Sequence, residues 1–343
     1  MNVLLVMDPF IRVPPAHYGG IERVVADLAD GLSRAGHRVT LWAAPGSHIT
    51  GGVEPFGREG EWTRWSNVRN VATLAARFWR RLTPFDVVHN FGRLAYLAPI
   101  LACDIAKVQT YMRPVNPQNM ALTKKLGARR LHFTAVSAAI RDTGRPGGGE
   151  WSVIYNCAVP ARFPLATDTD PRTAPLLFLG RLDRCKGAHH AITVAERLRR
   201  PLVIAGTISP LAHERAYFEA ELAPRIDGDL VRYVGPVNDE QKKQLFGHAA
   251  ALLMPIEWDE PFPVVLPESM LCGTPLIAFR RGGVPEGIDH GRTGFVCETV
   301  DEMTALVGQL PTIDRRQVRA EAERRFSDRA ILAEYLDLYC RLA

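Results

Sequence analysis

Along the first half of the chain, short continuous apolar runs alternate with segments in which apolar residues recur at helical spacing. Residues 2–7 form a short apolar run typical of a buried strand, and apolar residues then recur at helical spacing until Gly36. Similar runs predict strands at 38–43, 86–89, 105–110 and 132–136. A second helix is predicted from an apolar stripe of Val68, Val71, Leu74, Ala75, Phe78 and Leu82. This alternation indicates a parallel sheet covered by helices on both faces.

The pattern breaks near the middle of the chain and then starts again. Residues 144–149 predict a glycine-rich loop, a strand follows at 151–155, and 160–175 has the Pro-, Thr- and Asp-rich composition of a linker. Beyond it, a helix is predicted at 188–199, a helical tail at 314–343, and strands at 176–179, 202–205, 230–234, 250–254 and 275–278. The predicted fold class is α/β, with two Rossmann-like doubly wound domains that face a central cleft.

Composition agrees with an ordinary globular protein of two domains. The chain has 343 residues, of which 47% are hydrophobic and 23% charged. None of the six cysteines stands at Cys-x-x-Cys spacing, which excludes a zinc ribbon and fits a reducing cytoplasm. The first apolar segment ends at Asp8, too early for a signal peptide. The longest apolar run, 94–103, is about half a spanning helix, so we expect a cytoplasmic protein with at most peripheral membrane contact.

Charge is distributed unevenly between the two halves. Residues 1–165 hold 20 Lys and Arg against 11 Asp and Glu, a net charge of +9, and residues 166–343 hold 22 against 26, a net charge of −4. The basic half either meets an anionic surface or an acidic acceptor, or is simply the solubilising surface of an Arg-rich composition. No recognised nucleic-acid-binding motif is present, so nucleic acid is not an expected partner.

Two glutamates stand eight positions apart in a segment that combines a loop with a helix start. Glu260 precedes Pro261, and Glu268 follows Pro267, a residue suited to the first turn of a helix. The start of a helix attracts phosphate through its free N–H groups, and a nearby carboxylate can accept hydrogen bonds from sugar hydroxyls. Taken alone, the pair also fits two surface glutamates near a loop.

Two further segments place charge or glycine at the end of a predicted strand. Arg181 and Lys186 lie in the loop between a strand and a helix, where two cations suit a diphosphate or are merely solvated. Gly19 and Gly20 lie between the first strand and first helix, where they permit close approach of a ligand or form a simple turn.

Other signals are weaker. The Asp168-Thr-Asp170 sequence lies in the predicted linker, away from any strand end. His189 and His190 are adjacent, and adjacent residues face different sides of a helix, so they form a poor metal pair. Neither a phosphate-binding P-loop nor a Gly-x-Gly-x-x-Gly motif is present, which disfavours nucleotide hydrolases of that class and nicotinamide enzymes.

In their order along the chain, these segments resemble the family 4 retaining glycosyltransferases of the GT-B fold. The matching motifs are Gly-Gly-Ile-Glu-Arg-Val-Val, Gly-Arg-Leu-x-x-x-Lys-Gly, Glu-x7-Glu followed by Ser-Met-Leu-Cys-Gly-Thr-Pro-Leu-Ile-Ala, Gly-Gly-Val-Pro-Glu and Gly-Arg-Thr-Gly. The resemblance covers nearly the whole chain and is most specific in the second half. It implies an acceptor domain at 1–160, a donor domain at 161–326, and a terminal helix at about 327–343 that packs back on the first domain.

The resemblance also implies residue roles. Arg181 and Lys186 would neutralise the donor diphosphate, Glu268 would hold the ribose, and Glu260 would contact the donor sugar. The backbone of Val237 would meet the base. Glycines 19 and 20 would close over the phosphate from the first domain.

Two positions depart from the family pattern. Pro263 replaces a glycine and has no N–H, so the phosphate donors would be Val264, Val265 or Leu266. Phe91 replaces a histidine thought to touch the donor sugar, which makes His89 and Asn90 candidate contacts in the first domain, although His89 equally fits a side chain buried in the sheet.

We therefore expect a retaining glycosyltransferase that moves a sugar from a nucleotide-diphosphate donor, with UDP-sugar as first choice, to a hydroxyl of a glycan, lipid or natural product. No cofactor and no metal are expected, because Arg181 and Lys186 supply the charge. An Arg-, Ala- and Gly-rich composition leaves room for a role in antibiotic biosynthesis. The alternatives are a catalytically silent nucleotide-sugar-binding protein, motivated by Phe91 and Pro263, and a nucleotide-sugar epimerase on the same fold.

Overall fold

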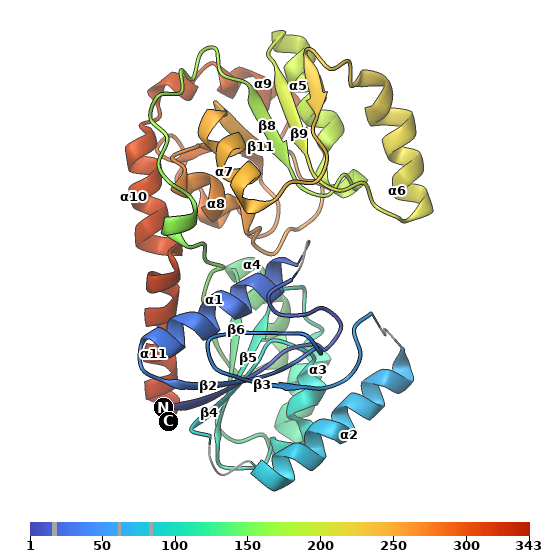
Figure 1. Cartoon of the computed structure of the whole chain (residues 1–343), viewed down its shortest axis with the longest axis vertical. Helices are drawn as coiled ribbons and strands as arrows, with labels where there is room; N and C mark the ends of the chain where they lie inside the picture. Colours follow the sequence, from blue (N-terminus) through green and yellow to red (C-terminus); the bar gives the residue numbers. More distant parts are fainter. Residues whose placement is uncertain (16–18, 61–62, 82–84) are drawn as a thin grey trace. The chain divides into compact units, whose positions relative to one another are not determined.

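The computed structural model describes residues 1–15, 19–60, 63–81 and 85–343 (Figure 1). Leu82, which belongs to the predicted apolar stripe of the second helix, lies outside these ranges. The chain divides into two compact units, the first made of Met1–Asn156 with Asp328–Ala343 and the second of Cys157–Ser327. The predicted linker therefore belongs to the second unit, and the boundaries fall after Asn156 and Ser327.

The first unit is built on a parallel sheet of seven strands among the described residues, in the order β3-β2-β1-β4-β5-β6-β7. Its strands are β1 (Asn2–Val6), β2 (Arg38–Ala43), β3 (Gly52–Pro55), β4 (Val87–Asn90), β5 (Ala106–Tyr111), β6 (Leu131–Ala135) and β7 (Glu150–Val153). Its helices are α1 (Gly20–Arg34), α2 (Arg64–Arg81), α3 (Pro117–Lys125), α4 (Ala138–Gly144) and α11 (Asp328–Leu342). The short strand β3 carries no clear apolar pattern, and the sequence did not predict it.

The second unit repeats this plan with a six-stranded parallel sheet in the order β10-β9-β8-β11-β12-β13. Its strands are β8 (Leu176–Leu179), β9 (Leu202–Ala205), β10 (Val231–Tyr233), β11 (Ala251–Met254), β12 (Leu276–Phe279) and β13 (Gly294–Cys297). Its helices are α5 (Ala188–Leu198), α6 (Ala212–Tyr217), α7 (Asp239–His248), α8 (Val265–Leu271), α9 (Val300–Val307) and α10 (Arg315–Phe326). The inner strands are apolar throughout because helices cover both faces of the sheet. Two Rossmann-like domains are therefore confirmed.

Each sheet has one point where the strand order reverses. In the first unit this point lies between β1 and β4, and in the second it lies between β8 and β11. In open α/β sheets, ligands bind at the carboxyl ends of the strands beside such a point. The residues that directly follow these four strands are therefore the first place to look for chemistry.

Helix α11 returns to the first unit and lies beside α1 (Figure 1). Arg34 on α1 donates to Asp328 at the start of α11, with 3.2 Å between Nη2 and Oδ2. Tyr335 and Tyr339 on α11 are buried in the first unit. The helical tail predicted at 314–343 is thus two helices, and the chain passes from one unit to the other between them.

The inner face of α2 differs from the predicted one. Leu74 and Phe78 are buried as expected, but Val68 points outward with 61% of its surface exposed. Ser66 and Asn70 take the inner positions instead, and both are almost fully buried. The apolar stripe read from the sequence was therefore wrong in its first turn.

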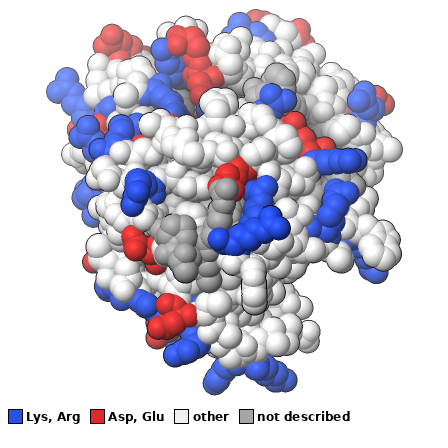
Figure 2. All heavy atoms as spheres, turned by 60° about the horizontal axis from the view of Figure 1, so that its bottom comes forward, with Lys and Arg blue, Asp and Glu red and all other residues white. Residues whose placement is uncertain are grey.

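Surface charge is dispersed on the face drawn in Figure 2, where Lys and Arg side chains lie in separate groups with acidic groups between them. Within the described residues, no helix is long and apolar enough to cross a membrane.

Candidate functional site

The loop after β8 carries the two predicted diphosphate ligands. Arg181 Nη2 lies 2.9 Å from Oδ2 of Asp183, a buried carboxylate in the same loop. A one-turn 3₁₀ helix, Arg184–Lys186, then leads into Gly187, which caps α5 with a φ of 77°. A Cβ at Gly187 would lie 1.9 Å from the carbonyl oxygen of Pro255, so only glycine fits there. This close contact ties the loop after β8 to the chain that follows β11.

Lys186 and Glu260 meet at the reversal point of the second sheet. Lys186 Nζ donates to Glu260 Oε2 across 2.5 Å, and both side chains are mostly buried. The ring of Trp258 lies 5.2 Å from the same ammonium, a cation–π distance. The backbone of Glu260 is held in turn, because its carbonyl accepts from the Gly283 N–H at 2.8 Å.

Glu268 has a partner that the sequence did not point to. Its Oε1 lies 2.7 Å from Nζ of Lys242 on α7, and Glu268 is only 2% exposed. Lys242 also lies 3.1 Å from Asp239, one turn earlier. Nothing in the spacing of α7 marks Lys242 as a site residue, since its role depends on how α7 packs against α8. The charge of Glu268 is thus matched inside the unit.

The start of α8 leaves fewer phosphate donors than predicted. Helix α8 begins at Val265, with Val264 as its N-cap and Pro267 inside its first turn. The N–H of Leu266 donates to the carbonyl of Pro263 at 3.1 Å. Leu266 is therefore already engaged, and the phosphate-donor role narrows to Val264 and Val265.

Val237 lies in the loop between β10 and α7, where a base-contacting backbone was predicted. It lines a hollow of about 350 Å³ together with Val234 and Gln241 among others. The hollow runs along the sheet face under α7, and its walls are mixed polar and apolar.

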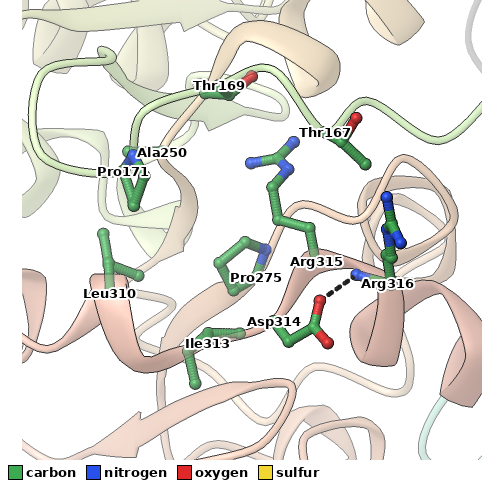
Figure 3. A pocket seen from close by; sticks show the side chains of 10 residues that line it. All are labelled: Thr167, Thr169, Pro171, Ala250, Pro275, Leu310, Ile313, Asp314, Arg315 and Arg316. Carbon is green, nitrogen blue, oxygen red and sulfur yellow. Dashed lines mark hydrogen bonds between the residues drawn. The ribbon is translucent and has the colours of Figure 1, made fainter.

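A second hollow, of about 330 Å³, lies at the opposite end of the second sheet (Figure 3). It is lined by Ala250 and Pro275, which precede β11 and β12, and by the linker and the start of α10. Arg315 points into it, but its guanidinium donates to the carbonyls of Ala166, Ala249 and Gly247 and to Thr274. Burial lowers the pKa of Arg315 to about 10. We interpret this arginine as a structural clamp.

In the first unit, Gly19 and Gly20 form the entry to α1. Helix α1 begins at Gly20, with Gly19 as its N-cap. A Cβ at Gly19 would lie 2.7 Å from Pro15 Cβ and 2.8 Å from Glu22 Oε2. The backbone of Gly19 therefore packs closely against the Glu22 carboxylate, and a side chain at this position would displace that carboxylate.

A charged cluster that the sequence did not single out lies at the reversal point of the first sheet. Asp8 follows β1, and its two carboxylate oxygens lie 3.7 Å from Arg93 and 3.7 Å from Arg113. Arg93 follows β4 and Arg113 follows β5. Burial raises the pKa of Asp8, although the two arginines and Tyr96 oppose that shift. The sequence could have pointed to this cluster, because each of its charged residues follows closely on one of three adjacent buried strands.

The structure bears out the buried alternative for His89, and it buries Asn90 as well. His89 is 0% exposed, with Nδ1 2.5 Å from the Tyr339 hydroxyl and Nε2 2.6 Å from Thr110 Oγ1. Asn90 is equally buried, and its amide donates to the carbonyl of Arg93 at 2.9 Å. Both side chains are occupied within the unit, because β4 is a central strand and its side chains face packed helices.

His189 and His190 also differ from expectation, since their ring centroids lie only 3.9 Å apart. Their side chains turn toward the same neighbour, Glu257, although the two residues are adjacent on α5.

Two family models match consecutive parts of the chain. The Glycosyltransferase Family 4 model matches residues 18–162, and the Glycosyl transferases group 1 model matches residues 162–331. The chain belongs to the family 4, or group 1, glycosyltransferases. As a member, it is a glycosyl transfer enzyme of the GT-B fold.

Several individual proteins are similar to this chain over almost its full length. The chain is 28% identical over 387 aligned positions to glycogen synthase of Mycobacterium tuberculosis, covering 96% of this chain and 91% of that protein. It is 29% identical to AviGT4, a glycosyltransferase involved in avilamycin A biosynthesis, with a TM-score of 0.71 over 99% of this chain and 97% of the other. HepE from Anabaena, in complex with UDP and glucose, shares the fold at 20% identity, with a TM-score of 0.74 over 99% of each chain.

Proposed function

We propose that the protein is a retaining, metal-independent glycosyltransferase that uses a UDP-sugar. The acceptor is a hydroxyl of a glycan, a lipid or a natural product. The main support is the Lys186–Glu260 ion pair beside the β8–β11 reversal point of the second unit. Arg181 lies in the same loop as Lys186, and Glu268 lies in the first turn of α8. Two cations and two carboxylates suit a ligand that carries both a diphosphate and sugar hydroxyls.

Departure of the diphosphate is the step in which the cations act. As the anomeric C–O bond breaks, negative charge grows on the leaving oxygen and the sugar becomes oxocarbenium-like. Fixed positive charge next to that oxygen stabilises the transition state more than the ground state. The guanidinium of Arg181 provides two-point hydrogen bonding and the ammonium of Lys186 a point charge. This supply of charge is why no metal is assigned to the diphosphate.

Retention of configuration requires attack from the face that the diphosphate leaves. We assign the acceptor's proton to the leaving phosphate, which becomes basic as it departs. We assign Glu260, which is paired with Lys186, to accepting hydrogen bonds from the donor sugar rather than to nucleophilic attack.

The nucleoside is assigned to Glu268 and Val237. Glu268 would accept hydrogen bonds from the ribose hydroxyls, and the contact with Lys242 holds its carboxylate in place. UDP is the preferred nucleotide because HepE of the same fold was crystallised with UDP and glucose. Of the three acceptor classes, we prefer a natural product, because the chain is similar to AviGT4, which is involved in avilamycin A biosynthesis.

The acceptor is assigned to the first unit. At the carboxyl ends of its inner strands, a polar acceptor would meet one carboxyl group and two guanidinium groups, those of Asp8, Arg93 and Arg113. The basic balance of residues 1–165 agrees with an acceptor that carries acidic groups.

The test is a turnover assay with UDP-sugars in EDTA, followed by NMR of the product's anomeric proton. We expect UDP release that depends on a hydroxyl acceptor and a product with the donor's anomeric configuration. Inverted configuration would refute retention, and loss of activity in EDTA that added Mg²⁺ or Mn²⁺ restores would refute metal independence. Isomerisation of the UDP-sugar in the absence of an acceptor would favour the epimerase alternative. Nucleotide binding without any turnover would favour the catalytically silent alternative.

A further inference from the structure

Three side chains of the types that bind metal ions lie close together beside the loop that follows β8. His189 and His190 lie in the first turn of α5, and Glu257 follows β11. Glu257 Oε1 lies 3.0 Å from His190 Nε2 and 3.7 Å from His189 Nε2. One ligand atom from each residue lies within 4.8 Å of the other two.

These spacings match those of ligands around one zinc ion. With Zn–N and Zn–O bonds of about 2.0–2.1 Å and tetrahedral angles, two ligand atoms lie about 3.3 Å apart. The observed separations of 3.0 Å and 3.7 Å fall on either side of that value. The third separation, between the ligand atoms of the two histidines, lies within 4.8 Å.

A second layer of contacts holds the group in place. His189 Nδ1 is hydrogen-bonded to the Tyr217 hydroxyl at 2.7 Å, which orients the ring and leaves Nε2 toward Glu257. Metal-binding histidines usually have such a partner on the other ring nitrogen. The N–H of Glu257 donates to the carbonyl of Cys185 at 2.9 Å, which fixes the backbone of the third ligand.

We propose that His189, His190 and Glu257 form a binding site for a divalent zinc-type metal ion, with a fourth position open to water. Two imidazoles and one carboxylate suit Zn²⁺ better than Mg²⁺ or Ca²⁺, which prefer oxygen ligands. The side chains are partly exposed, so an ion can enter from solvent.

The site is distinct from the diphosphate ligands and goes beyond the proposed transfer reaction. Its position gives it a structural consequence, because Lys186 lies three residues before His189 and Glu260 three residues after Glu257. A bound ion would brace the two segments that bring Lys186 and Glu260 together. We assign it to stabilising this loop pair and to no step of the reaction.

The test is titration of the untagged, metal-free protein with Zn²⁺, by calorimetry and by thermal melting. We expect one ion per chain and a rise in melting temperature, because an ion that binds the folded state stabilises it. His190→Ala and Glu257→Gln should each weaken binding by about tenfold or more. The matched control is His213→Ala, an exposed histidine elsewhere in the unit, which should bind Zn²⁺ like the wild type.

Cobalt separates this site from the six free cysteines. Co²⁺ held by His189, His190 and Glu257 shows no thiolate-to-metal charge-transfer band, whereas a cysteine site does. Such a band, or equal Zn²⁺ binding by wild type and His190→Ala, would overturn the proposal. Folding of each variant is checked by circular dichroism, and UDP titration reports separately on the transfer site.

A second, independent observation concerns the outer face of α2. Trp65 is 83% exposed, Trp79 is 91% exposed and Val68 is 61% exposed. Positions 65, 72 and 79 are seven residues apart, so they lie on one stripe of the helix, with alanine in the middle. The inner face carries buried Ser66 and Asn70. The largest apolar groups of this helix therefore point away from the unit.

The charges of α2 identify the kind of partner. The helix contains five arginines and no acidic residue, and Arg64, Arg69 and Arg80 are exposed along it. A second copy of this helix would bring arginines against arginines, which disfavours self-association. Tryptophan and arginine on one exposed helical face are typical of a helix that lies at a lipid surface. We infer that this face of α2 binds an anionic membrane surface.

The test is co-sedimentation with phosphatidylcholine vesicles that contain or lack phosphatidylglycerol. Wild type should pellet with the anionic vesicles, and less so at high salt. The double variant Trp65→Ser, Trp79→Ser should stay in solution, while Leu211→Ser, at an apolar position of the second unit that is 54% exposed, should pellet normally. Equal pelleting of the double variant would overturn the inference. So would a wild-type dimer that the double variant abolishes.

Discussion

Lys186 Nζ lies 2.5 Å from Glu260 Oε2, although the two residues are 74 positions apart in the sequence. The lysine assigned to the leaving phosphate is thus paired with the carboxylate assigned to the donor sugar. A diphosphate arriving at this point competes with Glu260 for the ammonium. The donor therefore replaces one charge partner with another, and no unpaired lysine has to be buried in its absence.

Replacing Lys186 should affect turnover more than binding. In Lys186→Ala, the growing charge on the leaving oxygen loses its fixed cation, so we expect kcat to fall about 10²–10³-fold and UDP affinity less than about tenfold. Lys243→Ala is the matched control, since Lys243 pairs with Glu240 on the outer side of α7. Equal losses in kcat and in UDP affinity would mean that Lys186 only anchors the diphosphate.

Glu268 should be needed for recognition of the ribose. We expect Glu268→Ala to weaken UDP binding by about tenfold to a hundredfold, because hydrogen bonds to a charged acceptor are lost. The sharper readout compares UDP with 2′-deoxy-UDP by calorimetry. Wild type should prefer UDP, and the variant should bind both nucleotides alike. A preference that survives in the variant would assign the ribose to another residue, and a general loss of folding would not mimic it.

Acceptor handling should depend on Arg113. We expect Arg113→Ala to raise the acceptor KM by about tenfold, the value of one charge-assisted hydrogen bond, with UDP affinity unchanged. Arg129→Ala serves as control, because Arg129 is an exposed arginine of the same unit. Steady-state kinetics with the acceptor varied gives the answer. An unchanged KM would remove the cluster around Asp8 from the acceptor site.

His89 should make the folded protein less stable as the pH falls below about 6.5. Burial lowers the pKa of His89 well below its usual value, so the folded protein holds it neutral while the unfolded chain takes up a proton below about pH 6.5. Unfolding is therefore favoured as the pH falls through that range, by about 1.4 kcal/mol per pH unit for one such group. We expect the pH dependence of urea unfolding to be smaller by that amount in His89→Asn, with UDP affinity retained. An unchanged pH dependence would show that another group is responsible.

The hydrophobic pattern was sufficient to predict most strands of the two sheets, because strands buried on both faces appear as apolar runs in the sequence. It failed where a polar residue is buried and an apolar one is exposed. Val68 lies on the outer face of α2, and Asn70 lies on the inner one. Strand β3 was missed because Gly52–Pro55 is a short edge strand with partly exposed side chains.

The site was predictable where a residue follows a strand and not where it depends on helix packing. Arg181 and Lys186 follow β8 directly, so their loop could be read from the sequence. Lys242 could not, since it reaches Glu268 only through the packing of α7 against α8. The convergence of His189 and His190 was missed for a similar reason, because side-chain rotamers and Glu257 decide it rather than position on the helix.

The central claim is that Arg181 and Lys186 bind the nucleotide diphosphate without a metal. Calorimetric titration with UDP in the presence of EDTA, on wild type and on Arg181→Ala/Lys186→Ala, tests it most directly. The account predicts one UDP per wild-type chain, unaffected by EDTA, and loss of binding in the double variant. Absence of binding to UDP, GDP and dTDP alike, or full UDP affinity in the double variant, would contradict it.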